Sequence, residues 1–110
     1  MSLKEKILAA VDLPSEPVAV PEWDCTVHMR TLTAAQRDKF AESCERDKFG
    51  NVRARLVSLS MTDETGQRIF SDKEIDALGG KSGMVLDRLF AVASRLNGFS
   101  AKDAEELEKN

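Results

Sequence analysis

The stretch from Ser82 to Asn97 constrains the fold more than any other part of the chain. Its apolar residues recur every three or four positions, at Val85, Leu86, Leu89, Phe90, Val92, Ala93 and Leu96. This spacing places them on one face of a helix and argues against a strand, in which apolar residues would alternate. Gly98 stands where a left-handed C-terminal cap is favoured, and Phe99 can fold back on the last turn. We predict a helix here whose apolar face is the spine of the core.

The size of the chain limits it to one domain. A domain of 110 residues can bury a single core and has little chain left for a deep active-site cleft. Charged residues of both signs are interspersed, and the formal net charge is -3. A nucleic-acid binder typically carries a basic stripe, so the charge pattern counts against that class of partner.

The sequence also argues against a membrane or secreted protein. No apolar run approaches the roughly 20 residues that span a bilayer. Lys4 and Lys6 precede an apolar block, Ile7–Val11, that is too short for the core of a secretory signal. Two cysteines, Cys25 and Cys44, are too few for a disulfide scaffold. We expect a soluble, cytoplasmic protein.

The N-terminal segment, residues 1–12, predicts a short helix. Ser2 and Glu5 form a capping box that opens a helix running to about Ala10. A helix of this length is marginal in isolation, so it must dock either on its own domain or on a partner. Both alternatives stay open here. The residues that would form its apolar face are Leu3, Ile7 and Leu8.

Residues 13–32 predict a proline-rich linker followed by a β-hairpin. The chain becomes extended at Val18–Val20, turns at Pro21–Asp24 and then alternates between polar and apolar residues over Cys25–Leu32. The alternation places Cys25, Val27, Met29 and Thr31 on one face. Because an isolated hairpin is marginally stable, this one should lie on the helices.

Residues 33–99 predict a helical core. Capping boxes at Thr33 and Ser71 open two further helices, the first running to about Lys48 and the second ending at Gly79–Gly80. The segment 52–61 is ambiguous, because its apolar residues fit either a helix or a strand; its many good helix formers favour a helix. Residues 100–110 predict a last, polar helix.

The fold class that we predict is therefore α+β. One predominantly helical domain, residues 1–110, carries a short N-terminal β-hairpin packed on about four to five helices.

Three patterns resemble known ligand sites, and each fails on inspection. Cys25, His28 and Cys44 could be metal ligands, but a closed zinc site needs four, and on a strand Cys25 and His28 face opposite ways. A small buried Cys25 and an exposed His28 explain the pair better. A calcium loop with its glycine at Gly66 would have Met61 as first ligand. Gly79–Gly83 lacks the first glycine of a phosphate-binding loop.

No catalytic group can be identified in the sequence. The chain has one histidine, no tyrosine and no carboxylate in an apolar context, so a general base is missing. A basic face could form from Arg37, Lys39, Arg53 and Arg55. A charged helix face is usually a solvated one, and we interpret it so. We predict no catalytic, cofactor-binding or metal-binding residues, and no cofactor.

The chain as a whole resembles the tail assembly chaperones of long-tailed phages over nearly its full length. No single piece is a catalytic signature; their order and spacing carry the resemblance. The pieces are Ser2–Leu8, Leu13–Trp23, Thr26–Leu32, Asn51–Val57, Asp63–Phe70, Leu86–Phe90 and Arg95–Gly98.

The resemblance implies a small, non-enzymatic protein of the host cytoplasm that is absent from the finished tail. Proteins of this kind are thought to coat the tape measure protein and to recruit tail tube subunits, and we expect a homo-oligomer with these two partners. A longer, frameshifted form would join at Ser100–Asn110. The alternative is a small helical adaptor or a nucleic-acid-binding regulatory protein of phage or host, against which the charge pattern counts.

Overall fold

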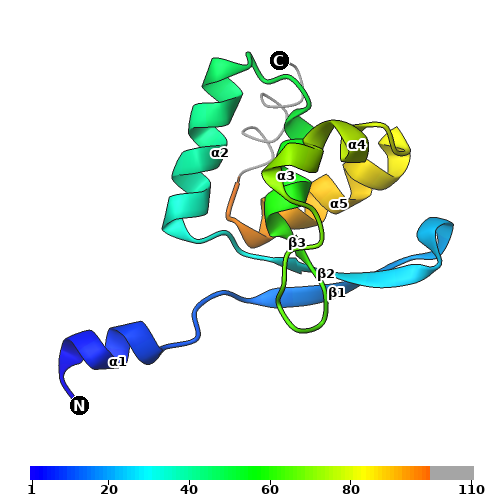
Figure 1. The fold of residues 1–110 in the computed structure, drawn as a ribbon. Coiled ribbons are helices and arrows are strands. Elements are labelled where there is room, and N and C mark those ends of the chain that lie inside the picture. The colour runs from blue at the N-terminus through cyan, green and yellow to red at the C-terminus, as the bar shows by residue number, and fades with distance from the viewer. Residues whose placement is uncertain (100–110) are drawn as a thin grey trace.

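The computed structural model describes residues 1–99, and the helix predicted over residues 100–110 lies outside this part of the chain. The described residues form an α+β fold in which α3 and α5 pack against a small antiparallel sheet (Figure 1). The described residues also include two short 3-10 helices, η1 and η2. In order, the elements are α1 (Leu3–Ala9), β1 (Ser15–Val20), η1 (Pro21–Trp23), β2 (Cys25–Arg30), α2 (Ala34–Arg46), α3 (Val52–Ser60), β3 (Met61–Thr62), η2 (Asp72–Glu74), α4 (Ile75–Gly79) and α5 (Gly83–Leu96).

Helix α5 forms where its apolar periodicity predicts, and both of its ends are capped. The Ser82 hydroxyl accepts a hydrogen bond from the Val85 N–H. At the other end Gly98 has a φ of 72°. The N–H groups of Gly98 and Phe99 donate to the carbonyls of Arg95 and Ser94. This pair of bonds is a Schellman motif, which satisfies carbonyls that the end of a helix leaves free.

Two of the three predicted capping boxes form in full, those at Thr33 and Ser71. At Ser2 the hydroxyl accepts from the Glu5 N–H and donates to the Glu5 carboxylate, so the reciprocal pair of bonds is not made there. The Thr33 hydroxyl accepts from the Gln36 N–H while the Gln36 side chain accepts from the Thr33 N–H. The same reciprocal pair joins Ser71 and Glu74 ahead of η2 and α4. Each box involves residues only three apart in sequence, so it forms without help from the rest of the fold.

Among the helices within residues 1–99, α3 is the most deeply buried, although the sequence predicted α5 as the spine of the core. It contacts α2, α4, α5, η2 and β2. A helix that is buried on nearly every side shows little amphipathic periodicity, which is why its sequence is ambiguous. The prediction of a helix for residues 52–61 is correct as far as Ser60. The buried residues of α3 are Val52, Ala54, Leu56, Val57, Ser58, Leu59 and Ser60.

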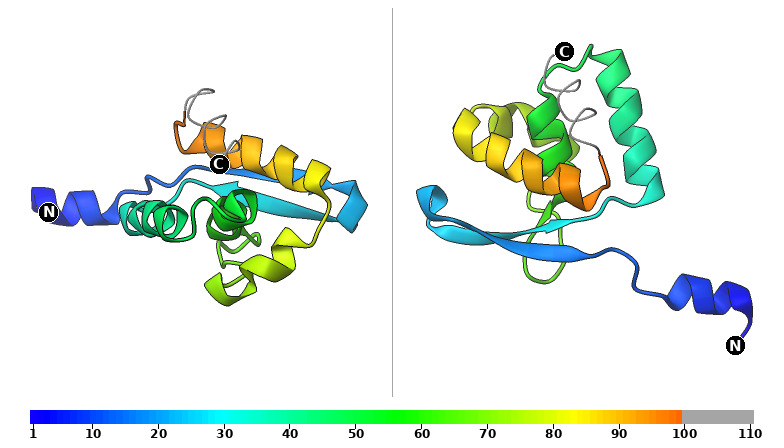
Figure 2. Two further views of the ribbon diagram at one scale, coloured as in Figure 1. Left: turned by 90° about the horizontal axis from the view of Figure 1, so that it is seen from above. Right: turned by 180° about the vertical axis from the view of Figure 1, so that it is seen from behind.

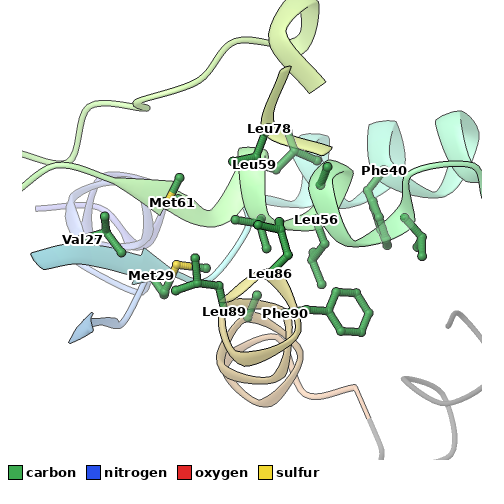
Figure 3. Packing of buried hydrophobic residues seen from close by; sticks show 14 of the residues in the cluster. Val27, Met29, Phe40, Leu56, Leu59, Met61, Leu78, Leu86, Leu89 and Phe90 are labelled. Carbon is green, nitrogen blue, oxygen red and sulfur yellow. The ribbon is translucent and has the colours of Figure 1, made fainter. Parts of the chain in front are cut away.

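The core lies between α3, α5 and the sheet. In Figure 3 side chains of both helices meet the apolar side chains of β2, while Leu78 of α4 lies beside Leu59 and Phe40 of α2 lies beyond Leu56, away from the strand. The predicted spine, α5, contributes one wall of this core. Its buried residues are Val85, Leu86, Leu89, Phe90, Ala93 and Ser94.

The sheet has three strands, where the sequence predicted a two-stranded hairpin. β1 pairs with β2 in antiparallel register, with Val18 opposite Val27. β3, which directly follows α3, adds two residues to the other edge of β2, with Met61 opposite Met29. The prediction missed β3 because two residues are too few for an alternating pattern. The first strand also begins earlier than predicted, at Ser15 within the proline-rich stretch.

The C-terminal end of α5 is tied to the β2–α2 junction by buried polar groups. The Asn97 carboxamide oxygen accepts from the Leu32 N–H at 2.8 Å, and its Nδ2 donates to the Ala93 carbonyl at 2.8 Å. The Thr31 hydroxyl donates to the Leu96 carbonyl. Because Asn97 is buried, loss of its side chain would leave the Leu32 N–H without its acceptor in a region that excludes water.

Loss of the Leu89 side chain should destabilise the core strongly. Leu89 is fully buried, so we expect Leu89→Ala to lower the free energy of unfolding by about 2–5 kcal/mol. Met84→Ala on the same helix is the matched control. Because the Met84 side chain is 84% exposed, it should change stability by less than about 0.5 kcal/mol. Urea denaturation measures both; equal effects would contradict the packing described.

Removal of the Asn97 carboxamide should also destabilise the fold. We expect Asn97→Ala to lower the free energy of unfolding by about 1–3 kcal/mol, because the Leu32 N–H loses its buried acceptor. Thermal and urea denaturation measure the change. Ala91→Ser, at an exposed position of α5, is the control, and an Asn97→Ala variant as stable as this control would show that the polar tie contributes nothing.

Candidate interaction surface

The three residues considered as metal ligands differ in how far they are buried. Cys25 is exposed at the start of β2, so the prediction that it is buried is wrong. His28 is half-buried in the same strand, where it was predicted to be exposed. Cys44 is buried on α2, and this burial raises the pKa of its thiol. Within residues 1–99, no cluster of three or more potential metal ligands is found.

Cys25 stands at the end of the hairpin, just after the turn and opposite Val20 in register. Strand alternation correctly places it on the same face as Val27 and Met29. Val27 and Met29 are buried, and so is Val20 opposite Cys25, whereas Cys25 itself is exposed. The face of a strand residue follows from the local pattern, whereas its burial depends on which distant elements cover that position.

The segment that resembled a calcium loop is a self-contained turn. One carboxylate oxygen of Asp63 accepts from the Thr65 N–H and hydroxyl, at 2.8 and 2.6 Å, and from the Gln67 N–H at 3.1 Å. These bonds hold the pKa of Asp63 below its ordinary value. Gly66 has a φ of 90°, which favours glycine. The Asp63 side chain is therefore engaged in shaping the turn.

The glycine-rich segment before α5 is a break between two helices. α4 ends at Gly79, and Ser82 serves as the N-cap of α5. Helix, not strand, precedes the glycines, so the strand–loop–helix arrangement of a phosphate-binding loop is missing here.

The four basic residues considered as a basic face all have partners within the described chain, so they form no free stripe. Arg53 pairs with Asp87, Arg55 with Asp47 at 2.7 Å, and Lys39 with Asp72 at 2.6 Å, while Arg37 donates to the Asn97 carbonyl at 3.0 Å. The Arg37 guanidinium also lies 4.8 Å from the centre of the Phe99 ring, which stacks on Phe40. These contacts join helices to one another, which is a structural role.

A groove of about 360 Å³ lies between α2 and the side formed by α3, η2 and α4. Basic and acidic side chains alternate around it, so it favours neither anions nor cations. The sequence did not indicate this groove, because its walls come from segments about 30 residues apart. Its lining residues are Lys39, Glu42, Ser43, Arg46, Asp47, Arg55, Leu59, Asp72, Lys73, Ile75 and Asp76.

The most unusual surface is the N-terminal arm, residues 1–14, which carries α1. Figures 1 and 2 show α1 standing apart from the other helices. None of its residues is buried. Leu3, Ile7 and Leu8 are 73%, 62% and 76% exposed. Single exposed apolar side chains are ordinary on protein surfaces, but several on one short helix indicate a binding surface.

Comparison with known proteins gives the chain a family. A family model described as phage tail assembly chaperone matches residues 2–110. The chain belongs to this family. Tail assembly chaperones have an assembly role, which agrees with a molecule whose most distinctive surface is an exposed apolar arm.

A solved structure shares the fold of this tail assembly chaperone. The structure of the bacteriophage HK97 tail assembly chaperone matches with a TM-score of 0.65 and 24% sequence identity. The match covers 86% of this chain and 98% of that chain. None of the curated proteins compared with the chain matches it. Within residues 1–99, no helix has both the length and the apolar character needed to cross a membrane.

The ion pairs at the groove predict a weak dependence of stability on pH. Hydrogen bonds from Lys39 and then Arg68 hold the pKa of Asp72 below its ordinary value of 3.8. The ionised form is therefore stabilised by folding, and its contribution is present above pH 3.8 and is lost as the pH falls through the lowered pKa. Since the Asp72 side chain is 39% exposed, this contribution is less than about 1 kcal/mol.

We expect Asp72→Asn to be slightly less stable than the wild type at pH 7 and equally stable below the lowered pKa. Urea denaturation across this pH range measures the difference. Glu64→Gln, which changes an exposed carboxylate without an ion pair among the described residues, is the control. A deficit of Asp72→Asn that persists in acid would contradict the ion-pair explanation.

Proposed function

We propose that this tail assembly chaperone binds the tape measure protein and recruits tail tube subunits while the phage tail is built. It acts without catalysis or a cofactor, as a homo-oligomer in the host cytoplasm, and it is absent from the finished tail. The match of the family model over residues 2–110 carries the proposal. The exposed apolar arm supports it, because a protein that holds another in solution must offer apolar surface.

The physical basis is the shielding of apolar surface before assembly. A long tape measure protein with apolar helical faces would aggregate if it waited unprotected in solution, since contact between such faces removes apolar area from water. Many copies of a small binding protein can cover such a molecule through contacts that are individually weak. Weak contacts are also reversible, so tube subunits can displace the chaperone.

Co-expression tests this function. We expect the tape measure protein of the same phage to be mostly insoluble when expressed alone and to become soluble, by at least about tenfold, when this chain is co-expressed. A small acidic protein of unrelated fold is the control. The complex should survive high salt, since apolar contacts are not screened.

The alternative, a nucleic-acid-binding regulator, predicts the opposite behaviour. Such a protein would be retained on DNA at low salt and released as salt rises. DNA retention of this kind, with no effect on the solubility of the tape measure protein, would reject the proposed function.

A further inference from the structure

Helix α2 is fixed to the domain by few buried residues. Of its 13 residues, only Phe40 and Cys44 are buried, whereas nearly all of α3 is buried. The chain on either side of α2 is anchored, because Leu32 and Val52 are both buried and the Leu32 N–H donates to the Asn97 side chain. A segment with few buried apolar contacts between anchored ends is of the kind that opens locally while the rest of a domain stays folded.

The C-terminal end of α2 has a strained backbone. The Lys48 N–H donates to the Glu45 carbonyl and the Phe49 N–H donates to the Cys44 carbonyl, which is the Schellman arrangement that also ends α5. In α5 the left-handed position of this motif is Gly98, whereas in α2 it is Lys48, with a φ of 51°, and Phe49 follows with a φ of 62°. A residue with a Cβ atom is disfavoured in this conformation, so the end of α2 stores strain that glycine would avoid.

Polar contacts at both ends hold α2 against this strain. At its C-terminal end, Arg55 of α3 pairs with Asp47 at 2.7 Å and donates to the Gly50 carbonyl at 2.6 Å. At its N-terminal end, the Arg37 guanidinium lies over the Phe99 ring, and a further ion pair joins the middle of α2 to η2. Because ion pairs with exposed partners contribute little, these contacts oppose movement of α2 only weakly.

We propose that α2 is a cover that opens from the core while the rest of the domain stays folded, with the strained residues 47–51 as its hinge. Residues 33–51 move as one unit between the anchored residues Leu32 and Val52. Figure 1 shows α2 along one side of the domain, next to α3. Opening uncovers the side of α3 that α2 contacts and the Phe99 ring that stacks on Phe40. The molecule thereby presents, for a time, an apolar surface separate from that of the N-terminal arm, and this inference does not depend on the proposed function.

Chemical labelling of Cys44 tests the opening. In a Cys25→Ser chain Cys44 is the remaining thiol, and because it is buried it reacts with dithiobisnitrobenzoate only when α2 opens. The opening constant from labelling should be at least about tenfold larger than the global unfolding constant from urea denaturation, and it should depend weakly on urea, because local opening exposes little surface. Hydrogen exchange should likewise be faster in α2 than in α5. Labelling of Cys44 with the same constant and urea dependence as global unfolding would overturn the inference.

Two substitutions of Lys48, made in the same Cys25→Ser chain, test the hinge. Lys48→Gly relieves the backbone strain and should slow the labelling of Cys44 several-fold. Lys48→Ala is the matched control, because it removes the same exposed side chain but keeps the strained backbone, and it should label as fast as the parent chain. Equal labelling of the two variants would show that the strain at residues 47–51 does not drive the opening, and would overturn the inference.

Discussion

The fold depends on the burial of α3 between its neighbours. The helix contacts α2, α4, α5 and β2, so nearly all of its side chains lose contact with water at once. Its two arginines are the exceptions, and they reach outward: Arg53 pairs with Asp87 of α5, and Arg55 pairs with Asp47 at the end of α2. Burial of a helix that is apolar on most sides requires every surrounding element to be in place, which makes the core cooperative.

The position of α5 explains how the molecule can carry an exposed apolar arm without loss of order. α5 packs on β1 and β2, and its arginines pair with the hairpin, Arg88 with Glu22 at 2.7 Å and Arg95 with Glu16 at 2.6 Å. These ion pairs hold the hairpin to the core, and the hairpin in turn fixes the end of the arm that leads into β1. Because α1 adds no buried residue to the core, core packing does not constrain its sequence, which can instead suit a partner.

The parts of the fold that the sequence predicted are those encoded by near neighbours. The capping boxes at Thr33 and Ser71 and the end of α5 at Gly98 each involve groups within about five residues of each other, and all three form. β3 and the exposure of Cys25 were not predictable, because each depends on where a distant element lies. For the candidate site, the apolar residues of α1 and its short length were evident from the sequence, whereas the charged groove beside α2 was not.

Periodicity, capping and turn chemistry operate over a few residues, so the helix ends, the hairpin and the apolar face of α5 could be predicted before the fold was known. The three-dimensional arrangement was needed to show that α3 is the centre of the core, that Asn97 ties α5 to the β2–α2 junction, and that α1 stands apart from the other helices. An apolar face has the same sequence whether it is buried or waits for a partner. The distinction appears only when the core is complete and one apolar face is left over.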